Sequence, residues 1–393
     1  MNRRSVKTII EVENNSKYQR MIEGGAMGKH EKQEKKKGGF FRGLLKLVVW
    51  LLVIVIVLVG GMIGFLSATE FKPGDVETAE IAGQANGKLK SGAEMTVMSW
   101  NIGYGALGDN ADFFMDGGTS VYTADEERVE SNMDGIIDNI GTSKPDIAFI
   151  QEIDQDSSRS HHTNEYEMLQ TEFPDYCTSF ANNFKVAYLP YPIPPMGKVD
   201  SGIATFSKYQ ADSAERIQLP IPFTWPMRMA NLKRCLLVER IPVAGSDKEL
   251  VLVNLHLEAY DSGEGKVAQT KQLAELLNQE YEKGNYVIAG GDFNQIFSSE
   301  DYNAFAVKEG MWSPGIIDVS TIPGKWNFLM DEKVPSCRSL DQPYAGSDKD
   351  NFQYYLIDGF ITSGNIDVKS CVTQDLGFKN SDHNPVLMKI KLK

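Results

Sequence analysis

An aspartate and an asparagine stand two residues apart directly after an apolar run, Tyr286–Ala289. The pair is Asp292 and Asn294 in the segment Gly290–Asn294. Such a run is typical of a buried strand, and the loop past a strand faces the crevice where α/β sheets bind ligands. The carboxylate can bind a divalent metal or accept a proton from water, and the amide can donate to a phosphoryl oxygen. We expect the two glycines to let a substrate approach the backbone closely; the competing interpretation is an ordinary Gly-Gly-Asp turn.

The same arrangement, a polar residue at one end of a strand-like run, recurs along the chain. An aspartate next to a histidine is also present, and an aspartate can orient an imidazole for proton transfer. If these strands end at a common mouth, their polar residues meet there. Each residue alone has an ordinary structural interpretation as a turn former, a solvated carboxylate or a core histidine. The residues are Asn101, Glu152, His256, Asp358, Asp382 and His383.

Two β-α-β units are predicted to position these residues. In the first, strands at 95–100 and 146–151 flank a helix whose apolar residues repeat at helical spacing from Val129 to Ile140. In the second, strands at 250–255 and 286–289 flank a helix with the same spacing. Further strands are expected at 201–207, 233–240, 354–361 and 385–390. The proline-rich stretch 188–195 is expected to form a rim loop because proline lacks the backbone donor; 298–350 is irregular, and we expect it to shape the pocket.

The charge of the chain is divided between its two ends. The 393 residues carry a net charge of −13, but residues 1–66 hold 12 Lys and Arg against 5 Asp and Glu, which leaves −20 on residues 67–393. Proteins that bind long nucleic acid through phosphate contacts are usually basic, so this acidity argues against a general nucleic-acid binder. An acidic surface does suit a site that collects metal cations.

Four cysteines lie far apart without a C-x-x-C pair: Cys177, Cys235, Cys337 and Cys371. This spacing argues against a zinc site and against a dense disulfide framework. One or two disulfides remain open if the domain is extracellular.

The N-terminal part predicts a membrane anchor. Residues 1–46 are a polar, basic tail, with Met27 as an alternative start, and residues 47–66 contain no charge and are long enough to span a bilayer as one helix. A cleaved signal peptide is the alternative, but its apolar region is shorter. Basic residues precede the span and acidic ones follow it, so the tail is expected in the cytoplasm, with a 67–93 linker and a 94–393 domain outside the cell.

The polar motifs together resemble the endonuclease/exonuclease/phosphatase superfamily, the deoxyribonuclease-I-like metallohydrolases. They occur in the family order over about residues 95–393, and six in order are specific where one is not. The motifs are Ser99-Trp100-Asn101, Gln151-Glu152, Asn254-Leu255-His256, Gly291-Asp292-Phe293-Asn294, Ile357-Asp358-Gly359-Phe360 and Ser381-Asp382-His383. The resemblance implies a four-layer α/β/β/α sandwich in which two β-sheets pack face to face with helices outside.

The resemblance also implies a role for each motif residue. Glu152 would be the main ligand of a divalent metal, with Asn101 and Asp382, and the ion would be Mg²⁺, with Mn²⁺ or Ca²⁺ as alternatives. Asp292 would orient or deprotonate the attacking water, and Asn294 would bind the phosphate. His256 and His383 would contact the scissile phosphate, with Asp358 holding His383. The implied metal ligands are thus Asn101, Glu152 and Asp382. The implied catalytic residues are Asp292, Asn294, His256, His383 and Asp358.

One departure from the family pattern concerns the residues after Glu152. Many nucleases of the superfamily carry a basic residue soon after this glutamate, whereas the first cation here is Arg159. Arg159 either contacts the substrate phosphate or pairs with a nearby aspartate, and the second is slightly favoured. The departure argues against a nuclease.

The sequence therefore predicts a membrane-anchored, externally facing, metal-dependent phosphoesterase. Its substrate is a lipid head group, as in sphingomyelinase-like relatives, a nucleic acid or a phosphorylated small molecule, and tethering favours the lipid. The alternative from another functional class is a binding domain with the same fold and no catalytic activity. Such a domain would be expected to have lost a metal ligand, and no motif position is missing. The sequence gives no indication of oligomeric state.

Overall fold

The computed structural model of the chain describes residues 39–261 and 263–393. The predicted tail up to residue 38 and the alternative start at Met27 lie outside this described part. The chain divides into two compact units, Met1–Phe65 and Leu66–Lys393.

One helix, Gly39–Thr69, is long and apolar enough to cross a membrane by length and composition, with a mean hydropathy of 3.0 over its most apolar window. It contains the whole predicted span 47–66. It also begins earlier than predicted, because residues 39–46, assigned to the tail, are helical.

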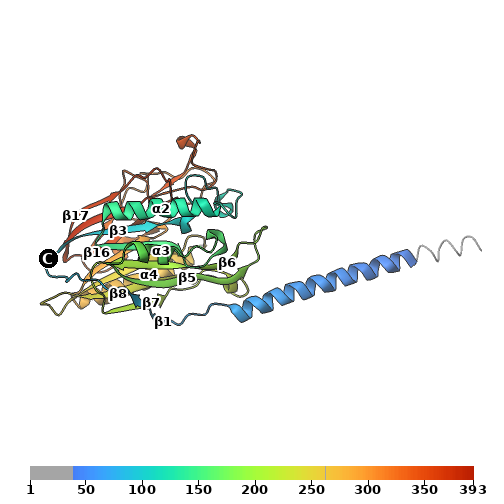
Figure 1. Cartoon of the computed structure of the whole chain (residues 1–393), viewed down its shortest axis with the longest axis horizontal. Helices are drawn as coiled ribbons and strands as arrows, with labels where there is room; N and C mark the ends of the chain where they lie inside the picture. The colour runs from blue at the N-terminus through green and yellow to red at the C-terminus, as the bar shows by residue number, and fades with distance from the viewer. Residues whose placement is uncertain (1–38, 262) are drawn as a thin grey trace, which may run out of the picture. The chain divides into compact units, whose positions relative to one another are not determined.

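Two seven-stranded sheets form the centre of the second unit (Figure 1). The first sheet has the order β1 (Val76–Thr78), β7 (Ser213–Gln218), β8 (Cys235–Pro242), β9 (Glu249–His256), β10 (Tyr286–Asp292), β16 (Asp358–Ser363), β13 (Trp326–Leu329). The second has the order β17 (Ile366–Thr373), β18 (Val386–Leu392), β3 (Glu94–Asn101), β4 (Ile147–Asp154), β6 (Gly197–Ser207), β5 (Cys177–Leu189), β2 (Ile81–Ala82). Neighbouring strands are antiparallel except for the pairs β9–β10 and β3–β4, which belong to the predicted β-α-β units.

Three helices cover the outer faces of the sheets. Alternate side chains of each strand point to opposite faces, so Val97 and Ile288 pack in the core between the sheets, while Met98 and Val287 pack outward. The outward residues of the second sheet meet α2 (Glu126–Ser143) and α3 (Glu165–Glu172), and those of the first meet α4 (Glu264–Glu282). In Figure 1, β3 lies next to α2, and β7 and β8 lie on the far side of the domain from α2. These layers confirm the predicted four-layer α/β/β/α sandwich.

The remaining elements are short. Two strand pairs, β11 (Gln295–Phe297) with β12 (Gly315–Ile317) and β14 (Cys337–Arg338) with β15 (Tyr354–Tyr355), lie outside the main sheets. The 3-10 turns are η1 (Gly103–Gly105), η2 (Phe114–Asp116), η3 (Ser158–Ser160), η4 (Met227–Ala230), η5 (Val319–Thr321) and η6 (Lys349–Asn351).

The predicted linker 67–93 is not a free spacer. Its strand β1 pairs with β7 and its strand β2 pairs with β5, so each main sheet gains an edge strand from this segment. The Glu70 carboxylate, whose side chain is 4% exposed, forms ion pairs with Arg228 and Lys233. The linker prediction is therefore wrong for most of the segment: hydrogen bonds and buried charge hold it in the folded unit.

Candidate functional site

The predicted site residues lie on the inner faces of the two sheets, at the same ends of their strands. Val97 of β3 packs between the sheets, and Asn101 follows it four positions later on the same face. Because side chains alternate along a strand, the same parity places three further residues on inner faces: His256 at the end of β9, Asp292 at the end of β10 and Asp358 at the start of β16.

Strand register then brings these residues side by side. Asp292 of β10 stands opposite His256 of β9 and opposite Asp358 of β16. On the facing sheet, Asn101 stands opposite Gln151 of β4. The sheets are joined by a hydrogen bond of 2.8 Å from Gln151 Nε2 to the inner-face residue Asn254.

Glu152 reaches the inner face because β4 bulges. Its neighbour Gln151 already faces inward, so a regular strand would turn Glu152 outward. Instead the register shifts between Gln151 and Ile153, and Glu152 has a φ of +50°. Bulges of this kind re-aim side chains next to active sites. The Glu152 carboxylate consequently accepts a hydrogen bond of 3.2 Å from Asn101 Nδ2.

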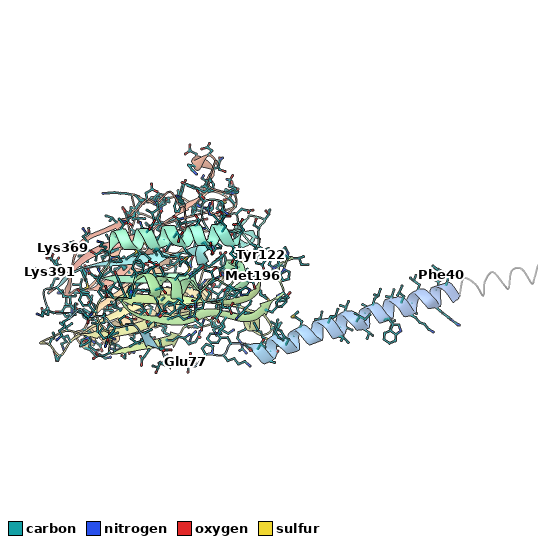
Figure 2. All side chains as sticks on the ribbon, viewed as in Figure 1. Phe40, Glu77, Tyr122, Met196, Lys369 and Lys391 are labelled. Atoms are coloured by element: carbon teal, nitrogen blue, oxygen red, sulfur yellow. The ribbon has the colours of Figure 1, made fainter. Side chains whose placement is uncertain are left out.

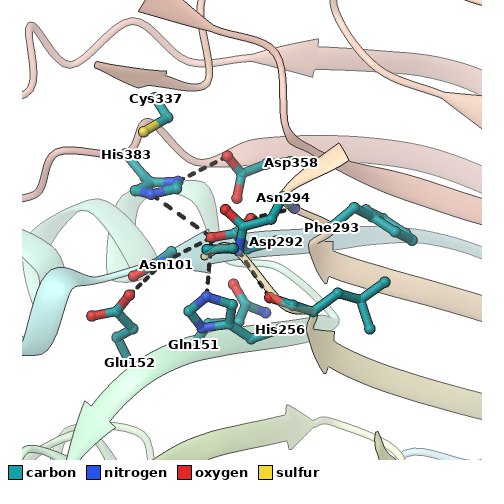
Figure 3. A network of polar contacts seen from close by, with 12 residues as sticks. Asn101, Gln151, Glu152, His256, Asp292, Phe293, Asn294, Cys337, Asp358 and His383 are labelled. Carbon is teal, nitrogen blue, oxygen red and sulfur yellow. Dashed lines mark hydrogen bonds and ion pairs between the residues drawn. The ribbon is translucent and has the colours of Figure 1, made fainter. Parts of the chain in front are cut away.

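Asp292 is the centre of the resulting network (Figure 3). One carboxylate oxygen accepts a 3.2 Å hydrogen bond from Asn101 Nδ2 and lies 3.4 Å from His256 Nε2 and 3.9 Å from His383 Nε2. The other accepts the backbone N–H of Asn294 at 2.9 Å. Side chains from four strands and the loop before β18 therefore meet at one buried carboxylate.

The two histidines differ in charge. Burial lowers the pKa of His256 well below its ordinary value, and nearby Arg234 lowers it further, so His256 is neutral. Burial would also lower the pKa of His383, but the Asp358 carboxylate, 2.8 Å from His383 Nδ1, outweighs burial and raises that pKa well above its ordinary value. His383 is therefore an imidazolium that can stabilise negative charge on a phosphate, while His256 offers a neutral ring.

Asp292 and Asp382, two carboxylates of the cavity, resist ionisation. Burial, reinforced by the Asp358 charge, raises the pKa of Asp292. Burial also raises the pKa of Asp382 to about 6, and the charge of Glu152 adds to this shift. Carboxylates that repel one another in a buried site are a suitable donor set for a cation, and oxygen ligands are those Mg²⁺ prefers. Glu152 and Asp382 offer oxygen donors of this type, and their roles as ligands of a divalent metal stay predictions.

Two groups of possible metal ligands have their donor atoms within 4.8 Å of one another: Asp292 with Asp358 and His383, and Cys337 with Asp382 and His383. Asn101, predicted as a metal ligand, uses its amide nitrogen to hold Glu152 and Asp292, and its Oδ1 accepts the N–H of Gly103. Its ligand role stays a prediction.

The glycines before Asp292 serve packing. A Cβ on Gly290 would lie 2.4 Å from the Phe360 ring, and a Cβ on Gly291, where φ is +149°, would lie 1.9 Å from the Leu255 carbonyl oxygen. Neighbouring strands and side chains occupy the space that a substrate would need. The expected close approach of substrate to these glycines is therefore wrong, and the reason is the tight fit of β10 between β9 and β16.

Asn294 and Arg159 both line the cavity, and each is already partnered. Asn294 Nδ2 donates to the Leu257 carbonyl at 2.9 Å, which leaves its second N–H for a ligand. Arg159 forms two hydrogen bonds, of 3.1 and 2.9 Å, to Asp154 and lies over the Tyr104 ring. Pairing with an aspartate, the interpretation favoured for Arg159, is confirmed.

A cavity of about 390 Å³ joins these residues. Glu152, Asp292 and His383 all line it, so the site residues share one space. Its lining also includes residues without a local sequence signal, from the loops after β3 and β9 and from the stretch 298–350, as expected for that stretch. They are Phe113, Met115, Asp116, Tyr260, Met311, Trp312, Cys337 and Leu340.

Asp116 and Tyr260 join two of these loops across the cavity. The Tyr260 hydroxyl donates to the Asp116 carboxylate at 3.0 Å, and burial raises the pKa of Asp116 to about 6. All four cysteines are free, so the disulfides left open by the sequence are absent from this structure, and Cys337 lies in the cavity wall.

Comparison with known proteins supports the fold. The structure of an endonuclease/exonuclease/phosphatase from Beutenbergia cavernae is similar, with a TM-score of 0.52 at 15% identity over 76% of this chain and 72% of that one. TDP2 from C. elegans gives a TM-score of 0.48 at 16% identity over 77% and 76% of the two chains. The human Nocturnin catalytic domain gives 0.47 at 17% over 80% and 98%. At 15% identity, the Beutenbergia cavernae structure shows a shared fold and no more.

No curated protein matches the chain. The model of the endonuclease/exonuclease/phosphatase family, however, matches residues 98–383, which is most of the chain and contains every motif from Asn101 to His383. The chain belongs to the endonuclease/exonuclease/phosphatase family.

Proposed function

We propose that this protein is a membrane-anchored, externally facing phosphoesterase that depends on a divalent metal and hydrolyses a phosphodiester or phosphomonoester by in-line attack of water. The observation that carries the proposal is the buried Asp292, which lies within 4 Å of His256 and His383 and within hydrogen-bonding distance of Asn101, in one cavity. A carboxylate between a neutral and a cationic imidazole suits attack by water on a phosphate.

Each residue has a part in the proposed reaction. Asp292 orients the water and accepts its proton, because burial has raised its pKa toward neutrality. The His383 imidazolium stabilises the negative charge that develops on the phosphoryl oxygens, and Asp358 keeps it protonated. His256 and the free N–H of Asn294 bind the phosphate. Glu152 and Asp382 would hold the metal, proposed as Mg²⁺, which supplies charge neutralisation for the phosphoryl group.

The cavity favours a small or single-chain phosphoester over duplex nucleic acid. The arginines that line it are engaged inside the protein: Arg159 with Asp154, Arg234 with Glu258 at 3.4 Å, and Arg338 with the backbone carbonyls of Gly108 and Ser339 at 2.7 and 2.8 Å. Apolar residues such as Phe113 and Leu340 form much of its wall. A groove for duplex DNA would instead present unpaired cations to successive phosphates. A lipid head group or a phosphorylated small molecule is therefore the better candidate, with a nucleic acid as the alternative.

Anchoring and orientation have separate support. The helix Gly39–Thr69 is long enough to span a bilayer, and the basic residues before the uncharged span 47–66 favour a cytoplasmic N-terminus under the positive-inside rule. Tethering through a flexible linker no longer supports a lipid substrate, because segment 67–93 contributes edge strands to both sheets.

Hydrolysis of bis-(p-nitrophenyl) phosphate tests the site. The wild-type chain should release p-nitrophenol in the presence of Mg²⁺ and stop when EDTA is added. Asp292→Ala and His383→Ala should each lower kcat by about 100-fold or more. Asp367→Ala, on the exposed face of β17, is the matched control and should keep full activity. Equal rates in all four proteins would reject the site.

A non-catalytic binding domain is the competing function. It predicts no turnover of any phosphoester, while Mg²⁺ and a phosphate analogue such as vanadate still stabilise the fold. The absence of p-nitrophenol release from the wild type, together with a Tm raised by vanadate, would favour this alternative.

A further inference from the structure

The loop Leu219–Leu232, which we call the tether loop, exposes two large apolar side chains. Trp225 is 59% exposed and Met227 is 65% exposed, and both belong to the segment that contains η4. Single exposed apolar residues are common on protein surfaces. The position of this loop along the chain is what gives these two residues significance.

The tether loop is fastened to the residues that follow the membrane-spanning segment. Ser67 Oγ donates to Met229 Sδ at 2.9 Å. The buried Glu70 carboxylate forms ion pairs of 3.1 Å with Arg228 and 3.7 Å with Lys233, and Lys233 also donates to the Arg228 carbonyl. Contacts from Ser67 and Glu70 thus hold the tether loop in place.

Chain length limits how far this loop can lie from a bilayer. Leu66 is the last residue of the predicted span, and Glu70 follows it by four residues. Four residues extend at most about 14 Å, and the interfacial region of a leaflet is roughly 5–7 Å thick. When the span crosses a membrane, Glu70 and the loop paired to it must therefore lie at or next to the interface.

The exposed residues of this region suit a lipid interface. Tryptophan is enriched there because its ring is apolar and its N–H is polar. Arg228 and Lys72 pair with Glu70, but their side chains are 44% and 65% exposed, and the two cations exceed that one carboxylate in charge, so they bring positive charge for lipid phosphates to this region.

We propose that the tether loop lies in the interface of the bilayer that holds the chain's own helix, with Trp225 and Met227 inserted among the head groups. This inference rests on the anchoring part of the proposed function. Leu232, at the end of the loop, and Arg234 line the catalytic cavity, so docking of the loop holds this side of the cavity next to the membrane. The substrate class that fits is a phosphoester carried by a lipid of the same bilayer.

The opposite end of the domain supplies a control. Figure 2 shows Lys369 and Lys391 at the end of the domain away from Tyr122 and Met196, and Met196 lines the cavity. Val372 lies on the same strand as Lys369 and is 48% exposed. It is apolar and exposed like Met227, and its strand pairs with β18.

Quenching of tryptophan emission by brominated lipid tests the docking without reference to activity. The full chain is reconstituted in phosphatidylcholine vesicles with or without bromine at carbons 6 and 7 of one acyl chain, with Trp50 of the span replaced by phenylalanine throughout. The emission lost on Trp225→Phe is the Trp225 signal, and bromination should reduce it by about half or more. Trp326→Phe gives the control signal from β13, which bromination should leave unchanged. Equal Trp225 emission in both vesicles would overturn the proposal.

Activity separates docking from presentation of the substrate. Trp225→Ser/Met227→Ser should lower hydrolysis of a vesicle phospholipid by about tenfold and hydrolysis of soluble bis-(p-nitrophenyl) phosphate by less than about twofold. Val372→Ser should change neither. Equal losses on both substrates would reject the lipid-presentation role. If the wild type hydrolyses neither substrate, the proposed function fails, but the quenching result still decides whether the loop docks.

Discussion

One carboxylate decides the charge of His383. Asp358 stands at the start of β16, 2.8 Å from His383 Nδ1, and its other oxygen has no partner within the described residues. Without that charge, burial would leave the imidazole neutral, as it does for His256. Asp358 is therefore a positioning residue that acts on substrate through His383.

Asp358→Asn should keep the fold and lower kcat by about 100-fold, because the imidazolium loses its counter-charge. The pKa of His383 is raised by Asp358, so removing the charge lowers that pKa. The alkaline limb of the kcat profile should consequently move to lower pH, while KM changes little. A profile with unchanged limbs would show that Asp358 only supports the strand; Asp367→Asn on β17 is the control.

Metal affinity should fall in acid. Burial, with the charge of Glu152 added, raises the pKa of Asp382 to about 6. A metal binds the ionised carboxylate, so each pH unit below 6 should weaken binding by up to about tenfold, while above pH 7 the affinity should level off. Titration of Mn²⁺ followed by electron paramagnetic resonance at pH 5, 6 and 7.5 checks this. Asp382→Asn should bind more weakly and with a flatter pH dependence; equal affinity of the wild type at all three pH values would contradict the assignment.

The motif residues could be predicted from sequence because each is a polar residue at or next to the end of a strand-like run. Trp312, Cys337, Asp116 and Tyr260 could not, since they reach the cavity from loops and from very short elements whose course depends on tertiary contacts. The bulge at Glu152, which turns that carboxylate inward, could not be predicted from the sequence either.

At the scale of elements, strand alternation explains both success and error. The long apolar runs of β3, β4, β9 and β10 carry a clear pattern. The edge strands β1 and β2 have three and two residues, which is too few to show a periodicity. The sequence of this segment therefore indicates a linker. Their pairing with β7 and β5 exists only in the folded sheets.

Position 291, near the end of β10, should tolerate no residue larger than glycine. A Cβ there would lie 1.9 Å from the Leu255 carbonyl oxygen, and φ is +149°. Gly291→Ala should destabilise the domain by about 3 kcal/mol or more. Gly74→Ala, where the nearest atom lies at 3.5 Å, should change stability by less than about 0.5 kcal/mol. Denaturant unfolding in detergent measures both, and similar stabilities would show that β10 can move away from β9.

Glu239 of β8 makes the contact between the two sheets sensitive to pH. It is buried, accepts a 2.5 Å hydrogen bond from Ser179 of β5, and has one oxygen without a partner within the described residues. Burial raises its pKa from 4.5 to about 8. The folded state therefore holds this proton more tightly than the unfolded state, and stability should fall as pH rises between these values.

Replacing Glu239 with glutamine should remove that dependence. Glu239→Gln should stabilise the protein at pH 7 by up to about 3 kcal/mol and have little effect near pH 4.5. Thermal unfolding of both proteins at pH 5, 7 and 8.5 tests the sign. A variant less stable than the wild type at pH 8.5 would mean that the ionised carboxylate is favourable in this contact.

For the whole molecule, charge and hydropathy predict the same orientation in a membrane. A basic segment precedes an uncharged span of twenty residues, and a domain of net charge −20 follows it. The positive-inside rule counts basic residues near the ends of a span. These residues are Lys35, Lys36, Lys37, Arg42 and Lys46, and only Glu31 and Glu34 lie among or just before them.

The catalytic domain should therefore react with reagents outside the cell. A cysteine at position 247, where the Asp247 side chain is 85% exposed, should take up a membrane-impermeant maleimide on intact cells, whereas one at position 36 should react only after permeabilisation. Replacing Lys35, Lys37, Arg42 and Lys46 by glutamine in both cysteine variants should produce a mixed population in which both positions react in part, because orientation follows the Lys and Arg bias. Labelling at position 36 alone in intact cells would place the domain in the cytoplasm, where a lipid of the outer leaflet is beyond its reach.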